Sequence, residues 1–478
     1  MSPAGPARPA TLGRRVVHNT SVQLAGKLAV MAVGVASIAI TTRYLGVAGY
    51  GRMALALTFL QTFGVLADAG LLTVTVREIS RRPERASELV STTLLLRLAL
   101  SLVVLVVAVL VSLVLPYDRT VRLAIVIAGA PFVLGLLSGS IVAVFQARLA
   151  MTKPVIADVT GRVCTFLALV AAVLADLGFY VVVATTGVGA AVTLALIWFF
   201  SRDVVTIRPS WDWARVRPLV VAAIPVGLTL AVNEIYFRAD TVLISLFRDF
   251  EDVGAYSLAY RVVELVGVFP AIVMTSVFPL MSRYLTENRE LAVRTIDATA
   301  DLFTALGLAV AVGGAILAPQ IVELAGGQSF EHAADPLRLL FTGAPLAAIS
   351  GLLGFMLIAA GRQRSALNLG LMALALNLAL NVALVPSLGI VAAAATAVAS
   401  DLFLLAGGLV LARRHLGITP RFSILPRAAL AAAAMGVPML ILQDVSILLL
   451  APAGAAVFLG VLYLVGGLDR TKLEALRP

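Results

Sequence analysis

Three pairs of oppositely charged residues lie inside long apolar stretches of the sequence. They are Asp158 with Arg162, Glu234 with Arg238, and Arg261 with Glu264. A separation of three or four residues puts both side chains on one face of a helix. Charge inside a membrane-spanning helix costs on the order of 3 kcal/mol, so each pair needs a reason. Either the partners neutralise each other in a packed bundle, or they form the polar wall of a water-filled cavity whose arginines contact an anionic ligand.

Two further cations, Lys27 and Arg97, lie within expected helices close to one end. Such long side chains can snorkel to the lipid headgroups. Alternatively, they capture a phosphate or pyrophosphate that enters from the cytoplasmic leaflet. Basic residues inside several helices favour an anionic substrate, and we expect its head group to be bound by Lys27, Arg97, Arg162, Arg238 and Arg261.

Uncharged polar and acidic residues complete the candidate site. Asp240 follows Asn233 by seven residues, on the same helix face, and is a candidate for binding a coupling cation or proton; an acid needed for packing is the alternative. Asn377 and Asn381 are one turn apart, which suits hydrogen bonds between helices or contact with a sugar. Asp68 lies near a helix end and suggests a structural role. A polar cavity or an ion-coupling site is therefore expected from Asp158, Asn233, Glu234, Asp240, Glu264, Asn377 and Asn381.

Motifs of soluble enzymes are missing from the sequence. We find no phosphate-binding Gly-rich loop with Lys and Ser/Thr, no His-Glu-x-x-His and no Gly-x-Ser-x-Gly. The three histidines are far apart, and the single cysteine, Cys164, can form no internal disulfide. We therefore expect no enzyme activity, no cofactor and no metal site. Energy for transport must come from an ion gradient such as H⁺ or Na⁺, the membrane potential, the substrate gradient or a partner.

The composition indicates which elements position these residues. Hydrophobic residues make up 60% of the chain, charged residues only 13%, and the mean hydropathy is +1.02, whereas soluble domains carry about 25% charged residues. A spanning chain must be helical or form a closed barrel, and the continuous apolar runs indicate helices. We predict an all-α membrane protein with about 14 transmembrane helices, since each span takes roughly 20 residues. Gly135 and Gly139 predict a close helix contact.

The basic residues indicate the orientation of these helices. Most of the 36 Lys and Arg residues fall in alternate loops, which the positive-inside rule assigns to the cytoplasm. Both termini are then cytoplasmic, in the inner membrane, and the arginines follow no basic face that would suit nucleic acid. The loops on the other side hold only Arg43, Arg52, Arg119, Arg122, Arg248 and Arg338.

The sequence also repeats itself. Val47, Tyr50 and Phe63 recur as Val253, Tyr256 and Phe269, and Pro131 and Arg148 recur as Pro345 and Arg362. Leu177, Gly178 and Thr185 recur as Leu388, Gly389 and Thr396. Duplicated halves are typical of transporters, with the substrate site at their interface. We predict an N-terminal six-helix lobe (1–217), a C-terminal six-helix lobe (218–415) and two extra helices (416–478).

Short motifs in this order resemble a known family. Arg43-Tyr44-Leu45-Gly46, Gly49-Tyr50-Gly51 and Asp68-Ala69-Gly70-Leu71 resemble the opening of Wzx-type polysaccharide-biosynthesis flippases, a branch of the multidrug/oligosaccharidyl-lipid/polysaccharide exporter superfamily. The second half adds Val253-Gly254-Ala255-Tyr256, Pro279-Leu280-Met281-Ser282-Arg283 and Leu388-Gly389-Ile390. The resemblance extends over the first twelve expected helices.

The resemblance implies a V-shaped cavity and alternating access. The substrate would be a polyprenyl-pyrophosphate-linked oligosaccharide, moved from the cytoplasmic to the periplasmic leaflet, and membrane lipid and polysaccharide assembly proteins are the implied partners. Three alternatives remain: a cation-coupled multidrug exporter, a lipid II flippase, whose usual N-terminal pattern is not found here, and a membrane glycan polymerase. A polymerase would need a sizeable catalytic loop, which is missing between the expected helices.

Overall fold

The computed structural model describes residues 9–68, 70–208 and 213–467, without the side chains of 9–21, 24, 213–215, 229 and 233. Its helices form two compact units, Met1–Arg238 and Ala239–Pro478. The division falls inside one helix, and the predicted boundary at 217/218, which follows the sequence repeat, stays a prediction. No strand occurs in the described ranges, which confirms the all-α class.

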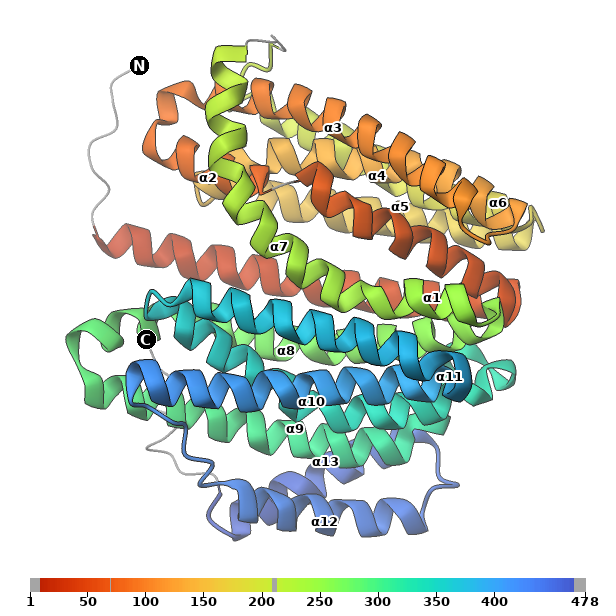
Figure 1. The fold of residues 1–478 in the computed structure, drawn as a ribbon, viewed down its shortest axis with the longest axis vertical. Coiled ribbons are helices and arrows are strands. Elements are labelled where there is room, and N and C mark those ends of the chain that lie inside the picture. Colours follow the sequence, from red (N-terminus) through yellow and green to blue (C-terminus); the bar gives the residue numbers. More distant parts are fainter. Residues whose placement is uncertain (1–8, 69, 209–212, 468–478) are drawn as a thin grey trace. The chain divides into compact units, whose positions relative to one another are not determined.

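Unit 1 consists of long helices joined by short turns (Figure 1). The first helix contains a break at Gly46, where φ is 66° and ψ is −179°, a conformation that favours glycine. It therefore comprises two helical segments rather than one straight rod. The elements are α1 (Pro9–Asp68), α2 (Leu71–Arg81), η1 (Pro83–Arg85), α3 (Ala86–Val114), α4 (Arg119–Ala147), α5 (Thr152–Leu174), α6 (Phe179–Ser201) and most of α7 (Trp213–Phe247).

Unit 2 begins with the end of α7 and has the same long-helix construction. Its longest helix breaks at Gly389, where φ is 66° and ψ is −152°. The remaining elements are α8 (Phe250–Glu287), α9 (Arg289–Gly326), η2 (Gln328–Ala333), α10 (Ala334–Ala359), α11 (Gln363–Leu416), α12 (Leu425–Ile441) and α13 (Ile447–Leu464).

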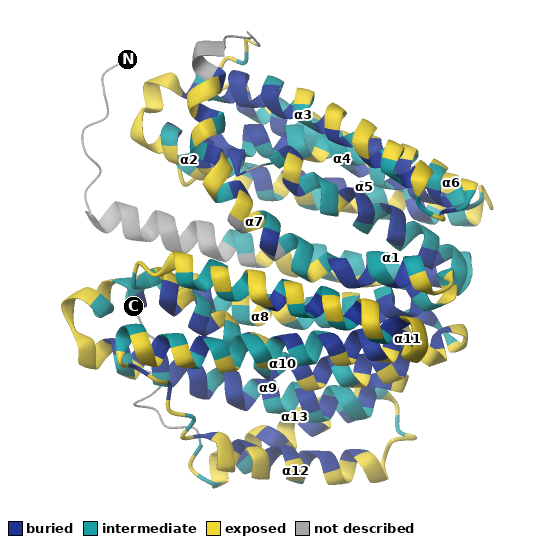
Figure 2. Cartoon of the chain, in the orientation of Figure 1, coloured by how far each residue is buried: buried dark blue, intermediate teal, exposed yellow. Residues whose placement is uncertain are grey.

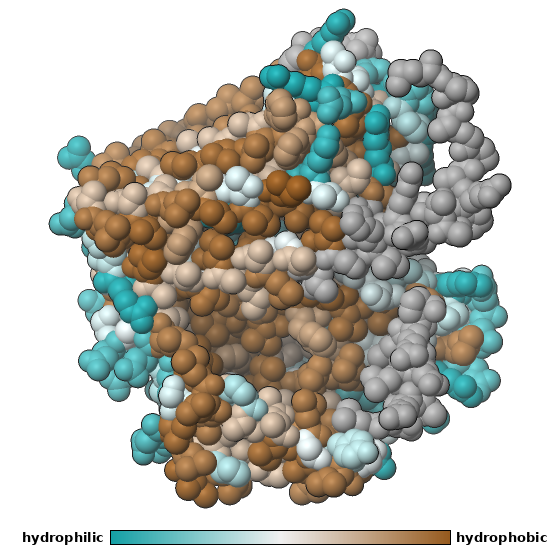
Figure 3. Space-filling model, turned by 180° about the vertical axis from the view of Figure 1, so that it is seen from behind, coloured by the Kyte–Doolittle hydropathy of each residue, from teal (hydrophilic) through white to brown (hydrophobic). Residues whose placement is uncertain are grey.

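Most of these helices are long and apolar enough to cross a bilayer. Length and composition give 10 such helices, or up to 11 with α7, whose two parts meet at a 47° bend. Counting the two segments of α1 and of α11 separately, and adding the shorter apolar helix α12, brings the described residues to the expected fourteen spans. Figure 3 shows hydrophobic residues along the lengths of the helices and hydrophilic residues gathered near their ends.

Two glycines at matching positions of the sequence repeat have similar backbone conformations. Gly178, directly before α6, has φ 78° and ψ 179°, close to the values at Gly389. These are the two glycines that the repeat matches at a separation of 211 residues. Because this region of φ and ψ is essentially restricted to glycine, the shared conformation supports the duplication of the two halves.

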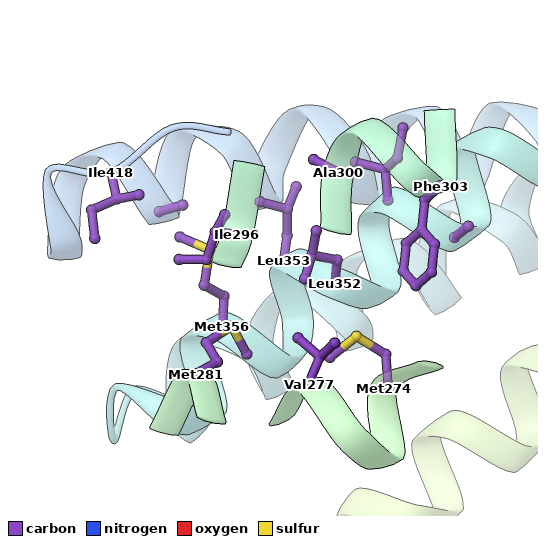
Figure 4. Packing of buried hydrophobic residues seen from close by; sticks show 13 residues of the cluster. Met274, Val277, Met281, Ile296, Ala300, Phe303, Leu352, Leu353, Met356 and Ile418 are labelled. Carbon is purple, nitrogen blue, oxygen red and sulfur yellow. The ribbon is translucent and has the colours of Figure 1, made fainter. Parts of the chain in front are cut away.

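Each unit has its own apolar core (Figure 2). In unit 1, α3, α4 and α6 contribute Val90, Val144 and Ile197, all fully buried. In unit 2, side chains of α8, α9 and α10 point toward one another, as Figure 4 shows for Met281, Ile296 and Met356.

A very close helix contact lies between α5 and α6. A Cβ added to Gly189 would collide with Thr165 Oγ1, and one added to Gly161 would collide with Thr193 Oγ1. The contact predicted for Gly135 and Gly139 is wrong, because nothing lies within 4 Å of the Cβ position of Gly135. At Gly139 the missing side chain leaves room for an arginine, Arg97, rather than for a neighbouring backbone.

A buried carboxylate fixes the C-terminal helix pair to the rest of unit 2. Asp301 on α9 is 3% exposed and accepts hydrogen bonds from Ser423 Oγ at 2.7 Å and Ile424 N at 3.1 Å. These groups directly precede α12, so Asp301 acts on that helix as a cap supplied by another helix. Apolar contacts of Met435 and Met439 with α9 and α13 continue the attachment.

Candidate functional site

The three predicted ion pairs form as expected. The Nε of Arg238 lies 2.8 Å from Glu234, Arg261 Nη1 lies 2.8 Å from Glu264, and Arg162 Nε lies 3.7 Å from Asp158. None of the pairs is buried: the side chains of Arg162 and Asp158 are 58% and 54% exposed, and Arg261 is 52% exposed. The pairs therefore form at the expected helical spacing. Because their side chains are exposed, they are not pairs that neutralise each other inside a packed bundle.

These exposed charges lie far from the helix ends. Arg162 follows the start of α5 by ten residues, about 15 Å at 1.5 Å per residue. Arg261 follows the start of α8 by eleven residues, about 17 Å on the same scale. Arg162 is therefore near the middle of its 23-residue helix. Since the hydrocarbon core of a bilayer is about 30 Å thick, this position corresponds to the middle of the membrane. Lipid is a poor neighbour for such groups, and water or an anion is a good one.

The pair on α7 has a second helix as a partner. Arg238 donates through Nε to Glu234 and through Nη1 to Gln61 on α1. Glu234 is the first residue beyond the break at which α7 bends by 47°. The carboxylate and amide hold one guanidinium at the bend, while 24% of the Arg238 side chain stays exposed. The side chain of Asn233, in the same turn, lies outside the described residues.

Arg97 occupies a different environment from the other cations. It is 2% exposed, pairs through Nη2 with Asp68 and donates through Nη1 to the carbonyl of Leu136 at 3.2 Å. The snorkelling interpretation of Arg97 is therefore wrong, since the side chain turns into the protein. Its role in head-group binding stays a prediction. Lys27, by contrast, is exposed on α1.

Asp68 has the structural role expected of it. It is the last residue of α1, and its pairing with Arg97 of α3 lies directly before the break at which α2 begins. At that break Gly70 has φ 76°, and a Cβ there would lie 2.7 Å from the backbone nitrogen of Gly227 on α7. The pair therefore joins α1 to α3 next to the close approach of Gly70 to α7.

A buried polar cluster in unit 2 surrounds Asp240. This residue is 3% exposed, accepts a hydrogen bond from the hydroxyl of Tyr256 at 2.8 Å and another from Asn381 Nδ2 at 2.9 Å. Asn381 Nδ2 also lies 3.2 Å from Asn377 Oδ1. The hydrogen bonds join α7, α8 and α11, which confirms the interhelical interpretation of Asn381, while Asn377 bonds to Asn381 on the same helix. Because Asn377 and Asn381 are 1% and 0% exposed, no sugar reaches them in this conformation.

One oxygen of this cluster has no partner in the described part of the chain. Asn381 Oδ1 is buried and accepts no hydrogen bond. Carboxylate and amide oxygens such as those of Asp240 and Asn381 are the ligands that hard cations take. Within the described ranges, no three His, Cys, Asp or Glu side chains gather in a group that would hold a metal ion.

The sequence does not indicate two of these partners. It identifies Asp68 only as a helix-end and motif residue, and the separation of 29 residues between Asp68 and Arg97 gives no periodic signal. It identifies Tyr256 only as a repeat and motif position, although a tyrosine hydroxyl in a membrane helix needs a hydrogen-bond partner when it is buried. That requirement, together with Asp240 sixteen residues earlier, is the signal that could have linked them.

Known proteins match parts of this sequence and share its fold. The MatE family model matches residues 225–383. The fold is similar to that of the lipid II flippase MurJ in an inward closed conformation, with a TM-score of 0.75, 12% identity, and coverage of 92% of this chain and 97% of the other. It is also similar to a mutant of the MATE transporter VcmN of Vibrio cholerae, with a TM-score of 0.60, 16% identity, and coverage of 85% and 98%.

A curated relative matches part of the sequence. It is the probable low-salt glycan biosynthesis flippase Agl15 of Haloferax volcanii, 28% identical over 160 residues, which are 33% of this chain and 34% of the relative. The matched region thus spans about a third of that protein. The family model described as polysaccharide biosynthesis protein matches residues 16–285, more than half of the sequence. This multi-pass membrane chain therefore belongs to the polysaccharide biosynthesis protein family.

Proposed function

We propose that the protein is a flippase that moves a polyprenyl-pyrophosphate-linked oligosaccharide from the cytoplasmic to the periplasmic leaflet by alternating access. Membership of the polysaccharide biosynthesis family and the partial match to a glycan biosynthesis flippase support the substrate class. We place the protein in the inner membrane with both termini cytoplasmic, on the Lys/Arg bias of its loops. Polysaccharide assembly proteins are the partners that this role implies.

The observation that carries the proposal is the exposure of guanidinium groups deep within apolar helices of each unit. Arg162 and Arg261 are more than half exposed. Facing lipid, each would cost about 2.5–3.5 kcal/mol on insertion scales. A pyrophosphate instead offers charge-assisted, forked hydrogen bonds that suit arginine. We assign the anionic head group to Arg162, Arg238 and Arg261, with Lys27 at its entry.

We assign ion coupling to the cluster around Asp240. The support is a buried carboxylate next to an amide oxygen, Asn381 Oδ1, that accepts no hydrogen bond among the described residues. A proton or Na⁺ bound there would neutralise the charge and change the hydrogen bonds that tie α7 to α8 and α11. Occupancy of the cluster would thereby bias the helix positions on which alternating access depends.

The head-group assignment is tested by binding of undecaprenyl pyrophosphate to the full chain in lipid nanodiscs. A hydrogen bond to a charged group contributes about 1.5–3 kcal/mol. Loss of one arginine should therefore weaken binding by about 10- to 150-fold. We expect this in Arg162→Ala and in Arg261→Ala.

Arg294→Ala is the matched control. Arg294 pairs with Glu290 at the same four-residue spacing as Arg162 with Asp158 and is 65% exposed. It follows the start of α9 by only five residues, about 8 Å, so the variant should bind like the wild type. If Arg162→Ala and Arg261→Ala bind as tightly as Arg294→Ala, the arginines do not hold the head group.

A cation-coupled multidrug exporter is the second candidate, because the MatE model matches residues 225–383, which include Asp240. That function predicts drug resistance that depends on an ion gradient and is lost in Asp240→Asn. If deletion of the protein leaves drug resistance unchanged and alters the surface polysaccharide, the result supports the flippase and excludes the drug exporter.

A further inference from the structure

The turns at one end of unit 1 form an open hollow of about 450 Å³. Its volume falls within the range of about 300–1,000 Å³ that is usual for small-ligand pockets. Lining residues with small or absent side chains leave room for the hollow: nothing lies within 4 Å of the Cβ position of Gly178, and Ala48 and Gly49 also line it. The side chains that line it include Tyr44, Ala48, Arg52, Thr120, Asp176 and Phe179.

Hydrogen bonds between turns give the hollow a fixed wall. The Tyr44 hydroxyl donates to Asp176 Oδ1 at 2.7 Å and accepts from the backbone nitrogen of Gly178 at 3.0 Å. Asp176 has φ 48°, which is unusual for a residue other than glycine, and the bond from Tyr44 holds its side chain in place. On the other side, Arg52 Nε donates to Asp118 at 2.9 Å. The wall is therefore built before any ligand arrives.

The chemistry of this wall suits a neutral ligand with many hydroxyl groups. Asp176 is exposed, and a carboxylate can accept several hydrogen bonds, of which Tyr44 supplies one. Thr120 can donate and accept, and the partly exposed guanidinium of Arg52 has five N–H donors. The ring of Phe179 adds an apolar face. Asp118 balances the charge of Arg52, so Asp176 leaves the wall with a negative charge that disfavours a phosphate and can accept hydrogen bonds from hydroxyl groups.

We infer that this hollow binds the saccharide portion of the substrate, as one or more uncharged sugar rings at the periplasmic end of unit 1. The inference rests on the proposed flippase function and adds a second subsite to it, separate from the arginines that hold the pyrophosphate. The placement follows from the predicted orientation, in which the loops at 43–49, 116–120 and 176–177 are periplasmic and the lining residues lie in or beside them. A sugar held there would be retained on the side to which it is delivered.

The test measures binding of a lipid-free and phosphate-free probe to the full chain in nanodiscs. The probe is the oligosaccharide released by mild acid from the lipid-linked glycans of the source cells and labelled at its reducing end. Ala48→Phe fills the hollow without removing a hydrogen bond, and Thr120→Val removes one hydroxyl at nearly constant volume. We expect at least tenfold weaker binding for the first variant and a clear loss for the second, with unchanged melting temperature.

Two controls separate the hollow from its surroundings. Leu174→Ala changes a residue of the same turn that is 82% exposed and does not line the hollow. Ser329→Ala changes another hollow, of about 570 Å³ in unit 2. Both should bind the oligosaccharide like the wild type. If Ala48→Phe fails to fold, Thr120→Val decides by itself.

The inference is overturned if the wild type does not bind the oligosaccharide, or if the folded variants bind it as well as the wild type does. The proposed function fails by a different result, namely absent binding and translocation of undecaprenyl-pyrophosphate lipids. Because Ala48 and Thr120 are not part of the arginine site, both variants should bind sugar-free undecaprenyl pyrophosphate normally. A parallel loss of both probes would show disturbance of the whole unit and would also refute a separate sugar subsite.

Discussion

Replacement of Asp240 by asparagine separates ion coupling from the structure of unit 2. The carboxylate is buried and accepts hydrogen bonds from Tyr256 and Asn381. An asparagine has the same shape: its amide oxygen can accept the bond from Asn381 Nδ2, and its NH2 group can donate to the Tyr256 hydroxyl, which can also act as an acceptor. Asp240→Asn should therefore fold, but it can no longer exchange a proton or bind a cation by charge.

The size of the expected effect follows from the single ionisable group in the cluster. One coupled cation that moves through a membrane potential of 100 mV contributes about 2.3 kcal/mol. At about 1.4 kcal/mol per factor of ten, this drives an extra leaflet asymmetry of roughly 45-fold. The substrate carries its own charge, but its contribution is the same in the wild type and in the variant. The difference between the two proteins at one potential therefore isolates the coupled cation.

The assay measures the leaflet distribution of a fluorescent lipid-linked oligosaccharide in proteoliposomes with an imposed potential and equal H⁺ and Na⁺ concentrations on both sides. The wild type should exceed Asp240→Asn in asymmetry by roughly 45-fold at 100 mV, and the two should agree when the potential is zero. Equal asymmetry at every potential, with both proteins folded and active, would refute the assignment of coupling to Asp240.

Three further predictions concern stability, each read out by unfolding of the purified protein. Asp68→Ala leaves the guanidinium of Arg97 buried without its partner and should lower the free energy of unfolding by about 3–5 kcal/mol. The double variant with Arg97→Met should regain most of this stability. Equal stability of the wild type and Asp68→Ala would contradict the ion pair. Gly189→Leu places a Cβ in collision with Thr165 Oγ1, so the melting temperature should fall, and an unchanged value would mean that α5 and α6 are not in close contact. Asp301→Ala removes the acceptor for two groups before α12 and should lower the free energy of unfolding by about 1–3 kcal/mol. The C-terminal helices should also be cleaved faster by protease. Protection from protease equal to that of the wild type would exclude the cap.

Much of the fold can be predicted because the bilayer restricts it. Apolar runs of spanning length can only be helices, so the class and the approximate number of spans follow from hydropathy. The repeat is also visible in the sequence, and the matching glycine conformations at Gly178 and Gly389 support it. Close packing is harder to locate, since small residues are common in membrane helices. Gly135 and Gly139 have the same four-residue spacing as Gly161 and Thr165. Only Gly161 and Thr165 lie in close contact with the backbone and side chains of a neighbouring helix.

The site is predictable only where partners share a helix. The pairs of Arg162, Arg238 and Arg261 follow from spacing along one helix, and the structure confirms them. Partners on different helices carry no periodic signal, which is why the sequence does not link Asp68 to Arg97. Burial is equally hidden: Arg97 and Arg162 look alike in sequence, yet one side chain is 2% exposed and the other 58%.

Translocation by the purified protein is the most direct measurement of the central claim. Liposomes that contain the full chain and a polyprenyl-pyrophosphate-linked oligosaccharide should show protein-dependent transfer of the glycan between leaflets, detected by access of an external glycosidase. Arg162→Ala should slow the transfer, and Arg294→Ala should not. Transfer no faster than in protein-free liposomes, with folded protein and an imposed gradient, would contradict the account.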